Sequence, residues 1–230
     1  MTTRRVNLNT ESVDNYLKAI YALGGPEEER VSSTALSERL GVAPASVTNM
    51  LQKLAASPNP FVEYESRRGV RLSTAGRKRA LEIVRHHRLL ETFLYEVLNY
   101  PIEEVHGEAE RLEHFISERF EERIDAKLGR PKFDPHGHCI PALDGRMRKH
   151  ASRPLADAED GKFVVDSISD QDATLLKKLK AHGVTPGARV HVKGLAQGEL
   201  LLRTADRSKP LRLPRSAAKA VRIRIEKLTN

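Results

Sequence analysis

Ser32-Ser33-Thr34-Ala35-Leu36-Ser37-Glu38-Arg39-Leu40-Gly41, followed three residues later by Pro44, is the stretch that decides the fold. A serine that can cap a helix and a terminating glycine predict a short helix within this stretch. Pro44 suits the first position of a second helix, which we expect to reach about Ala56. Two short helices joined by a glycine turn predict a helix-turn-helix, with an ordinary helical hairpin as the alternative.

The second of these helices separates into an apolar and a polar face. The apolar stripe consists of Val47, Met50, Leu51 and Leu54. Small hydroxyl and amide side chains on the other face can approach base edges in a major groove. The residues that we predict to contact DNA from this helix are Ala45, Ser46, Thr48, Asn49, Gln52 and Lys53.

The segment that follows predicts a β-hairpin. Residues 61–64 and 70–72 have the composition of short strands, and the basic segment 65–69 joins them. A helix-turn-helix followed by such a hairpin is the order of a winged helix. Arg67 and Arg68, at the hairpin tip, are expected to bind DNA phosphates, which positions the protein without reading sequence.

Helices are predicted on both sides of this unit. Apolar residues at i, i+3, i+4, i+7 and i+8 from Val13 predict an amphipathic helix over about 11–23. A longer helix is expected over about 75–98, with more apolar surface than a small winged helix can cover. The surplus predicts a homodimer. A two-fold axis also suits an operator with two half-sites.

A predicted helix from Pro101 through Phe120 carries two imidazoles and two carboxylates: His106, Glu110, Glu113 and His114. With about 100° per residue, these four fall within an arc of roughly 100°. A divalent cation relieves the repulsion and the burial cost of such a face, because neutral imidazole and ionised carboxylate are its ligands. His87 and Glu91, spaced i,i+4, form a second pair. We predict a metal centre; two solvated, charged helices are the alternative.

Composition narrows the class of protein. A chain of 230 residues with 39% hydrophobic residues suits one large domain or two, and its net charge of +8 is compatible with a nucleic-acid or acidic-lipid partner. There is no apolar run of membrane-spanning length, and residues 1–5 lack a signal-peptide core. The single Cys139 excludes an intramolecular disulfide. A cytoplasmic protein with no membrane partner is expected.

The last third of the chain predicts a separate β module. Residues 146–161 are polar and are predicted to be a flexible linker. Beyond them, short strands alternate with Gly and Pro turns, which is typical of a small barrel. Strands are expected over 162–168, 188–195, 199–204, 210–213 and 221–226, with a helix over 170–182.

Residues 11 to about 143 closely resemble the DtxR-type (diphtheria toxin repressor-like) metal-dependent transcriptional regulators, in their carboxylate-rich, manganese- or iron-responsive branch. The motifs that carry the resemblance are residues 13–21, 44–48, 86–91 and 105–114 and Ile140-Pro141. The C-terminal third resembles the SH3-like (FeoA-like) domain of many members. The resemblance implies a mainly α fold with a C-terminal all-β module: a winged helix-turn-helix over 1–74, a helical dimerisation and metal-binding domain over 75–145, and a small SH3-like barrel over 162–230.

The resemblance also implies a primary, activating metal site, made by Glu110, Glu113 and His114 with one ligand from the first helix. That ligand aligns with Asn15, where members usually have Met or Asp; Asp14 or Glu11 is the alternative. Members that respond to iron commonly have Cys at the position of Glu110, whereas manganese-responsive members have a carboxylate. Mn²⁺ or Fe²⁺ is therefore the expected cofactor.

An ancillary site is implied as well, which makes two sites per subunit. His87 and Glu91 match it. One branch completes the site from a Cys-Pro-His-Gly loop, which is Asp134-Pro135-His136-Gly137 here, and the other branch uses the position of His106. Asp134 and His136, or His106, are thus expected ligands. The C-terminal domain of relatives lends a further ligand, here Asp170 or, as alternatives, Gln171 and Asp172.

The predicted function is metal-dependent transcriptional regulation. Mn(II) or Fe(II) would activate a homodimer to bind palindromic, double-stranded operator DNA and control metal-homeostasis genes. A metal-independent winged-helix DNA-binding protein, with purely structural His and Glu residues, is the alternative. A di-iron oxidase would require paired Glu-x-x-His motifs, and only Glu103 to His106 fits. Because no nucleophile–base arrangement or phosphate loop is present, we predict neither enzymatic activity nor a small-molecule substrate.

Overall fold

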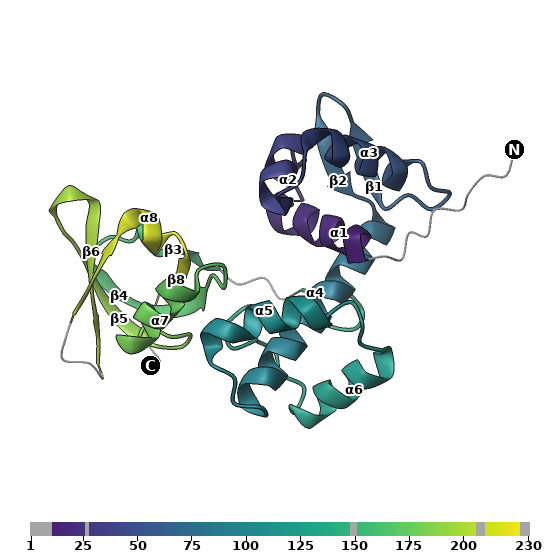
Figure 1. Cartoon of the computed structure of the whole chain (residues 1–230). Coiled ribbons are helices and arrows are strands. Elements are labelled where there is room, and N and C mark those ends of the chain that lie inside the picture. Colours follow the sequence, from purple (N-terminus) through teal and green to yellow (C-terminus); the bar gives the residue numbers. More distant parts are fainter. Residues whose placement is uncertain (1–10, 26–27, 148–150, 206–209, 226–230) are drawn as a thin grey trace, which may run out of the picture. The chain divides into compact units, whose positions relative to one another are not determined.

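The computed structural model describes residues 11–25, 28–147, 151–205 and 210–225 (Figure 1). Contacts within the chain divide it into two units. The first contains the described residues up to His86 together with 113–115 and 141–146, and the second contains 87–112, 116–140 and the described residues from Met147 onward. Within these described ranges, no helix combines the length and the apolar character that a membrane span requires.

The first unit is a winged helix. Its elements are α1 (Glu11–Gly24), α2 (Ser33–Leu40), α3 (Pro44–Ala55), β1 (Val62–Glu65), β2 (Gly69–Leu72) and the start of α4 (Thr74–Glu96). The two strands pair antiparallel, with Val62 opposite Leu72. Figure 1 shows the three N-terminal helices beside this hairpin. The predicted winged helix-turn-helix is confirmed.

Local signals account for the helix-turn-helix. The Ser32 side chain accepts a hydrogen bond from the backbone N–H of Ala35 at 3.1 Å, and Gly41 ends α2 in the left-handed region with φ 64°. Pro44 begins α3. The helices and the hairpin then bury one shared core, which includes Leu17, Leu36, Val47, Leu51, Leu54 and Val70.

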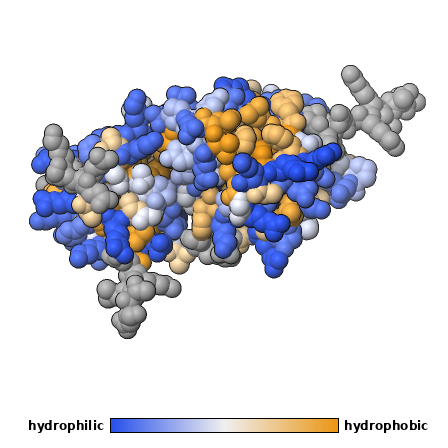
Figure 2. Space-filling view, turned by 90° about the horizontal axis from the view of Figure 1, so that it is seen from below, coloured by the Kyte–Doolittle hydropathy of each residue, from blue (hydrophilic) through white to orange (hydrophobic). Residues whose placement is uncertain are grey.

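The helical part of the second unit consists of the remainder of α4, α5 (Ile102–Leu112) and α6 (Glu118–Lys127). These helices share a core formed by Leu89, Leu90, Leu94, Val105, Ala109, Ile124 and Ile140. Figure 2 shows apolar side chains gathered on one face of the molecule. Large apolar residues of this helical part that stay exposed are Val97, Leu98, Leu112, Phe120 and Phe133.

The prediction of one helix from Pro101 through Phe120 is wrong. Helix α5 ends at Leu112, residues 113–115 form a turn, and a new helix starts at Glu118. The Ser117 side chain accepts a hydrogen bond from the N–H of Phe120 and so caps α6. Glu113 and His114 therefore lie in a turn, and the argument that placed them on a helix face with His106 does not hold.

The rest of the second unit is a β module. Its elements are β3 (Arg153–Pro154), η1 (Leu155–Asp157), β4 (Gly161–Ile168), α7 (Ala173–Ala181), β5 (Arg189–Gly194), η2 (Ala196–Gly198), β6 (Glu199–Thr204), β7 (Leu211–Pro214), α8 (Arg215–Ala218) and β8 (Val221–Ile225). The strands pair antiparallel in the order β3-β8-β4-β5-β6-β7. Inward residues such as Val190 and Val192 alternate with exposed ones along β5.

Two predictions for this module need correction. Within the described residues β3 and β7 are sheet edges, so the SH3-like sheet is open and is not a closed barrel. The predicted flexible linker is too long, because β3 and η1 lie inside it and Leu155 and Ala158 are buried in the core of the sheet. The sequence prediction missed them because most of the residues around these few apolar side chains are polar. Residues 148–150 and Glu226, which the sequence predictions included, lie outside the described residues.

Gly76 allows α4 to begin close to the wing. A Cβ at this position would lie 1.9 Å from the carbonyl oxygen of Phe61. Gly76→Ala should therefore force the helix away from the hairpin and lower the free energy of unfolding by about 1–3 kcal/mol. Urea unfolding followed by circular dichroism measures this loss.

Gly107→Ala is the matched control, because it changes a glycine within α5 whose added Cβ would have no heavy atom within 4 Å. It should be neutral or stabilising by up to ~1 kcal/mol. Equal stability of the two variants would contradict the close approach at Gly76.

Candidate metal centre

The first group of candidate ligands combines helix α1 with the turn after α5, and we call it the turn site: Asn15, Glu113 and His114. His114 Nε2 lies 3.1 Å from Asn15 Oδ1 and 3.3 Å from Glu113 Oε1. The Glu113 side chain is fully buried and that of His114 is 4% exposed. An imidazole nitrogen, a carboxylate oxygen and an amide oxygen thus converge, which is a donor set suited to a divalent cation.

Asp14 holds the imidazole of the turn site from behind. Its carboxylate accepts hydrogen bonds from Arg79 at 2.8 and 3.0 Å, and its Oδ2 lies 3.4 Å from His114 Nδ1. Burial opposes ionisation of Asp14, but the contacts with His114 and Arg79 outweigh it and hold the pKa of this carboxyl below its usual value. A carboxylate behind a ligand histidine fixes the ring orientation. This geometry favours Asn15 over Asp14 as the ligand from α1; Glu11 is exposed.

Lys18 supplies positive charge to the buried carboxylate of the turn site. Its Nζ lies 2.7 and 2.9 Å from the two oxygens of Glu113. Sequence reasoning missed this lysine, although Asn15 and Lys18 are three residues apart on a helix and so share a face. A metal cation that binds Glu113 must compete with this ion pair.

Glu110, the remaining predicted primary ligand, lies on α5 within the second unit. Its Oε2 is 3.6 Å from His87 Nδ1, and its side chain is 42% exposed. The structure thus brings Asn15, Glu113 and His114 together in the first unit, and it brings Glu110 beside an imidazole of the second group of candidate ligands.

That second group, the histidine cluster, consists of His87, Glu91, His106 and Asp170. His87 Nε2 lies 3.0 Å from Glu91 Oε1 and 3.1 Å from His106 Nδ1, and the His106 nitrogen is 3.4 Å from Glu91 Oε1. Asp170 Oδ2 is 3.3 Å from the same nitrogen. Helix α4 supplies His87 and Glu91, α5 supplies His106, and the segment before α7 supplies Asp170.

The charges of the histidine cluster stabilise one another. Burial opposes ionisation of Glu91, yet the charge of His87 and contacts with His106 and His136 hold its pKa well below the usual value. Burial would lower the pKa of His106, but contacts with Asp170 and Glu91 raise it to about 10. The pKa of Asp170 is lowered, because contact with His106 outweighs burial. The protonated imidazoles thus supply the positive charge that a metal ion could supply to these carboxylates, and metal binding would release the imidazole protons.

The alternatives to Asp170 have other positions. Gln171 Nε2 lies 2.7 Å from Asp170 Oδ1 and 3.3 Å from His106 Nε2, at the exposed edge of the histidine cluster. Asp172 caps α7 by accepting a hydrogen bond from the N–H of Leu175 at 2.9 Å. Of the three candidates, Asp170 is therefore the one whose carboxylate faces the imidazoles.

The loop pair Asp134 and His136 lies on the other side of Glu91. His136 is fully buried; its Nε2 lies 3.2 Å from the Ile102 carbonyl oxygen and its Nδ1 lies 3.6 Å from Glu91 Oε2. Asp134 Oδ1 accepts hydrogen bonds from the N–H groups of His136 and His138, both at 2.9 Å. The two sets of ancillary ligands that the sequence offered as alternatives therefore both surround Glu91.

Buried polar atoms without hydrogen-bond partners mark the places where a cation fits. Among the described residues they include Glu91 Oε2, Asp134 Oδ2 and His136 Nδ1. Leaving such groups unsatisfied costs about 1–3 kcal/mol each. The residues present thus fit a divalent cation, because their donor atoms suit one and some of these buried atoms have no other partner.

The predicted DNA-contacting residues of α3 are available to a ligand. Ala45, Ser46, Asn49, Gln52 and Lys53 are exposed. Thr48 is half-buried, and its hydroxyl donates a hydrogen bond to the Pro44 carbonyl oxygen at 3.2 Å. On the wing, Arg68 pairs with Glu65 at 3.3 Å, whereas the exposed Arg67 has no recorded carboxylate partner in the described part of the chain.

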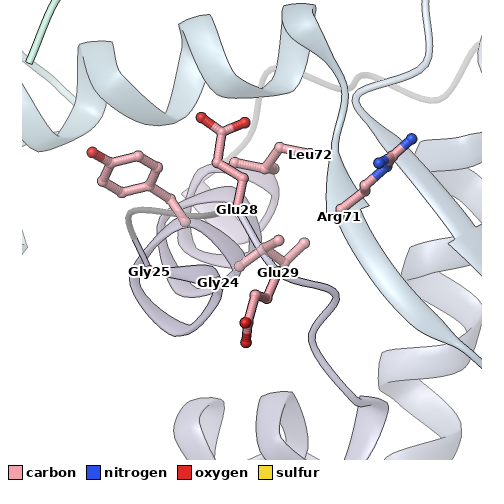
Figure 3. A pocket seen from close by; sticks show the side chains of 8 residues that line it. Gly24, Gly25, Glu28, Glu29, Arg71 and Leu72 are labelled. Atoms are coloured by element: carbon pink, nitrogen blue, oxygen red, sulfur yellow. The ribbon is translucent and has the colours of Figure 1, made fainter.

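A small pocket lies elsewhere in the first unit, between the end of α1 and strand β2 (Figure 3). Its lining includes the carboxylates Glu28 and Glu29 and the guanidinium of Arg71, but no histidine and no predicted metal ligand. We therefore assign the pocket no part in the metal centre.

The ion pair at the turn site generates a prediction. Lys18→Gln should lower the free energy of unfolding in EDTA by about 1–3 kcal/mol, because Glu113 loses its charged donor. Added Mn²⁺ should stabilise this variant more than the wild type, since the competing ammonium is gone. Thermal unfolding in EDTA and in excess Mn²⁺ measures both effects.

Lys127→Gln, an exposed position on α6, removes the same charge and should change little under either condition. A loss of stability in Lys18→Gln that is equal in EDTA and Mn²⁺ would show that Lys18 and metal do not compete.

Comparison with known proteins agrees with this arrangement of DNA-binding and metal-binding parts. The family profile described as iron dependent repressor, N-terminal DNA binding domain, matches residues 9–70; iron dependent repressor, metal binding and dimerisation domain, matches 73–142; and the FeoA domain matches 153–225. The iron-dependent repressor IdeR of Mycobacterium leprae is 30% identical over 228 residues, covering 93% of this chain and 96% of the relative.

Solved structures of metal-dependent repressors have the same fold as this chain. A manganese-dependent transcriptional repressor in complex with manganese superimposes with a TM-score of 0.83 at 36% identity, covering 92% of this chain and 98% of that one. ScaR with bound Zn²⁺ gives a TM-score of 0.77 at 30% identity, with the same coverages of 92% and 98%. The resemblance drawn from the sequence motifs is thereby confirmed, and the chain belongs to the iron-dependent repressor family of metal-dependent transcriptional regulators.

Proposed function

We propose that this protein is a metal-dependent transcriptional repressor in which a divalent cation at the turn site makes the winged helix competent to bind operator DNA. The observation that carries the proposal is the position of residues 113–115. They are continuous in sequence with α5 on one side and lead to α6 on the other, yet by their contacts they belong to the DNA-binding unit. Asn15 of α1 faces His114 of this turn at 3.1 Å.

The coupling follows from this connection. Asn15, Glu113 and His114 would hold the cation, and Glu110, three residues before Glu113, would join them from the end of α5. The bound cation supplies charge neutralisation and bonds that tie α1 to the turn. Metal binding would thereby act on the DNA-binding unit through the turn that belongs to it. Because binding equilibria are reciprocal, operator DNA must tighten metal binding by the same factor as metal tightens DNA binding.

The donor atoms favour a hard cation. The turn site with Glu110 offers two carboxylates, one amide oxygen and one imidazole, and the histidine cluster offers two carboxylates and two imidazoles. Oxygen-rich sets of this kind suit Mn²⁺ and Fe²⁺, and neither contains a thiolate, which softer ions prefer. We propose Mn²⁺ or Fe²⁺ as the activating ion, with the turn site as the primary site and the histidine cluster as the ancillary one.

A homodimer follows from the apolar surface of the helical part. Val97, Leu98, Phe120 and Phe133 stay exposed there. Burial of apolar surface contributes about 25 cal/mol per Å², so pairing of two such surfaces stabilises an assembly. Two recognition helices related by a two-fold axis would then reach major grooves about 34 Å apart on a palindromic site.

An enzymatic role has no support in the family, whose named members are repressors. The remaining alternative is a metal-independent DNA-binding protein with structural His and Glu residues. The buried atoms without partners at Glu91, Asp134 and His136 favour the metal-dependent proposal, because a purely structural cluster would satisfy them within the protein.

Glu113→Gln and His114→Ala should each lower metal-stimulated DNA binding on the order of 100-fold, because each removes one of few ligands from the turn site. The probe is a DNA fragment selected by the wild-type chain from a random library in the presence of Mn²⁺, and fluorescence anisotropy measures its binding against Mn²⁺ concentration. Glu104→Gln, an exposed carboxylate on α5, is the control and should bind like the wild type.

Two outcomes would count against the proposal. An unchanged metal response in Glu113→Gln would refute the assignment of the primary site. Wild-type binding to specific DNA that is equal in EDTA and Mn²⁺ would establish the metal-independent alternative.

The DNA-binding surface makes a separate prediction. Asn49→Ala and Ser46→Ala should relax sequence preference, because these exposed side chains of α3 are expected to meet base edges. Arg67→Ala should weaken binding to all DNA and lower the salt dependence by about one phosphate contact. Arg68→Ala should have a smaller effect, since Glu65 already pairs with it at 3.3 Å.

Competition assays with selected and random duplexes at several salt concentrations separate these effects. An equal loss on both duplexes in Asn49→Ala would contradict the placement of α3 in the major groove.

A further inference from the structure

The loop after α6 carries a ligand set of its own, separate from that of the histidine cluster. Glu91, Asp134 and His136 each offer one ligand atom, and these three atoms lie within 4.8 Å of one another. Glu91 Oε2, Asp134 Oδ2 and His136 Nδ1 have no hydrogen-bond partner. The side chains of all three residues are 0% exposed. Three buried, unsatisfied atoms that face one another, two of them carboxylate oxygens, indicate a site for a cation.

The two oxygens of Glu91 face different partners. Oε1 lies 3.0 Å from His87 Nε2 and 3.4 Å from His106 Nδ1, within the histidine cluster. Oε2 lies 3.6 Å from His136 Nδ1, on the loop side. One carboxylate therefore belongs to both ligand sets, one oxygen to each. This is the arrangement of a carboxylate that bridges two metal ions.

The spacing of the atoms fits two ions without a large rearrangement. Ligand atoms bound to one metal at about 2.1 Å lie about 3.0–3.4 Å apart in octahedral or tetrahedral geometry. The histidine cluster has separations of 3.0, 3.1, 3.3 and 3.4 Å, and the loop set has 3.6 Å between Glu91 and His136. Paired metal ions in proteins are about 3.5–4 Å apart.

We infer that Glu91 bridges a pair of divalent cations, one held by His87, His106 and Asp170 and the other by Asp134 and His136. The inference rests on the proposed metal-dependent function and deepens its ancillary site, because the two ligand sets are filled together. Each chain then holds three ions, two in this pair and one at the turn site.

The two ions of the pair differ in affinity. Arg88 Nε lies 3.6 Å from Asp134 Oδ2 and adds positive charge on the loop side, and His138 Nδ1 lies 3.3 Å from the same oxygen. The histidine cluster has two carboxylates, Glu91 and Asp170, within contact distance of its imidazoles. The loop ion is therefore the weaker of the two and fills last in a titration.

Asp134→Asn tests the loop site alone. The amide keeps the size of the side chain and an oxygen that can accept the hydrogen bonds from the N–H groups of His136 and His138, so the loop should keep its turn. Equilibrium dialysis against Mn²⁺, with metal analysis of the full-length chain, should give one ion fewer than the wild type. Glu91→Gln should lose two ions through one substitution, which a single-ion site cannot produce.

Electron paramagnetic resonance gives a second readout that does not depend on DNA binding. Two Mn²⁺ ions joined by a carboxylate should show an exchange-coupled signal in the wild type at saturating metal. Asp134→Asn should show only the six-line signals of isolated ions. Glu113→Gln should keep the coupled signal while losing metal-stimulated DNA binding, so failure of the proposed function and failure of the bridged pair remain distinguishable.

Two results would overturn the inference. One is a wild-type spectrum of isolated ions at every Mn²⁺ concentration. The other is equal metal content in the wild type and Asp134→Asn, which would mean that a single ion uses Glu91. Because Asp134→Asn leaves the core of the helices unchanged, the test stands even if Glu91→Gln does not fold.

Discussion

The need of buried carboxylates for positive charge connects most features of this protein. The side chains of Glu91 and Glu113 are both fully buried. An ionised carboxylate in the interior is strongly unfavourable unless it is paired. The chain pairs Glu113 with Lys18 and surrounds Glu91 with His87, His106 and His136. A divalent cation can replace the Lys18 ammonium at Glu113 and the protons of the imidazoles around Glu91, so the interactions that stabilise the fold also define the metal sites.

The turn at residues 113–115 shows how folding and regulation share the same residues. Because α5 stops at Leu112, the next residues leave the helix and meet α1, where Lys18 and Asn15 contact them. The Glu113 backbone carbonyl also lies 3.1 Å from His86 Nδ1 of α4. A continuous helix would have kept Glu113 and His114 in register with His106. The helix break is therefore the structural condition for a switch that acts on the DNA-binding unit.

The loop after α6 connects the helical part of the second unit to the β module. Gly137 has φ 87°, and a Cβ there would lie 2.2 Å from the Asp166 carbonyl oxygen of β4, so only glycine permits this approach. Next to it, the His136 carbonyl accepts a hydrogen bond from the N–H of Ile168 at 2.9 Å. The backbone of a ligand residue is thus hydrogen-bonded to the end of β4. Asp170, two residues beyond Ile168, reaches the histidine cluster from the same side of the chain.

The sequence by itself determined what depends on neighbours along the chain. Ser32, Gly41 and Pro44 define the helix-turn-helix through capping and backbone preference, and the i,i+4 spacing of His87 and Glu91 already gives half of the histidine cluster. Only the tertiary structure decided where α5 ends, that Lys18 pairs with Glu113, and that Asp134, His136 and Asp170 all converge near Glu91. Those contacts join residues 43 to 95 positions apart, and the local pattern carries no information on which distant groups will meet in a shared core.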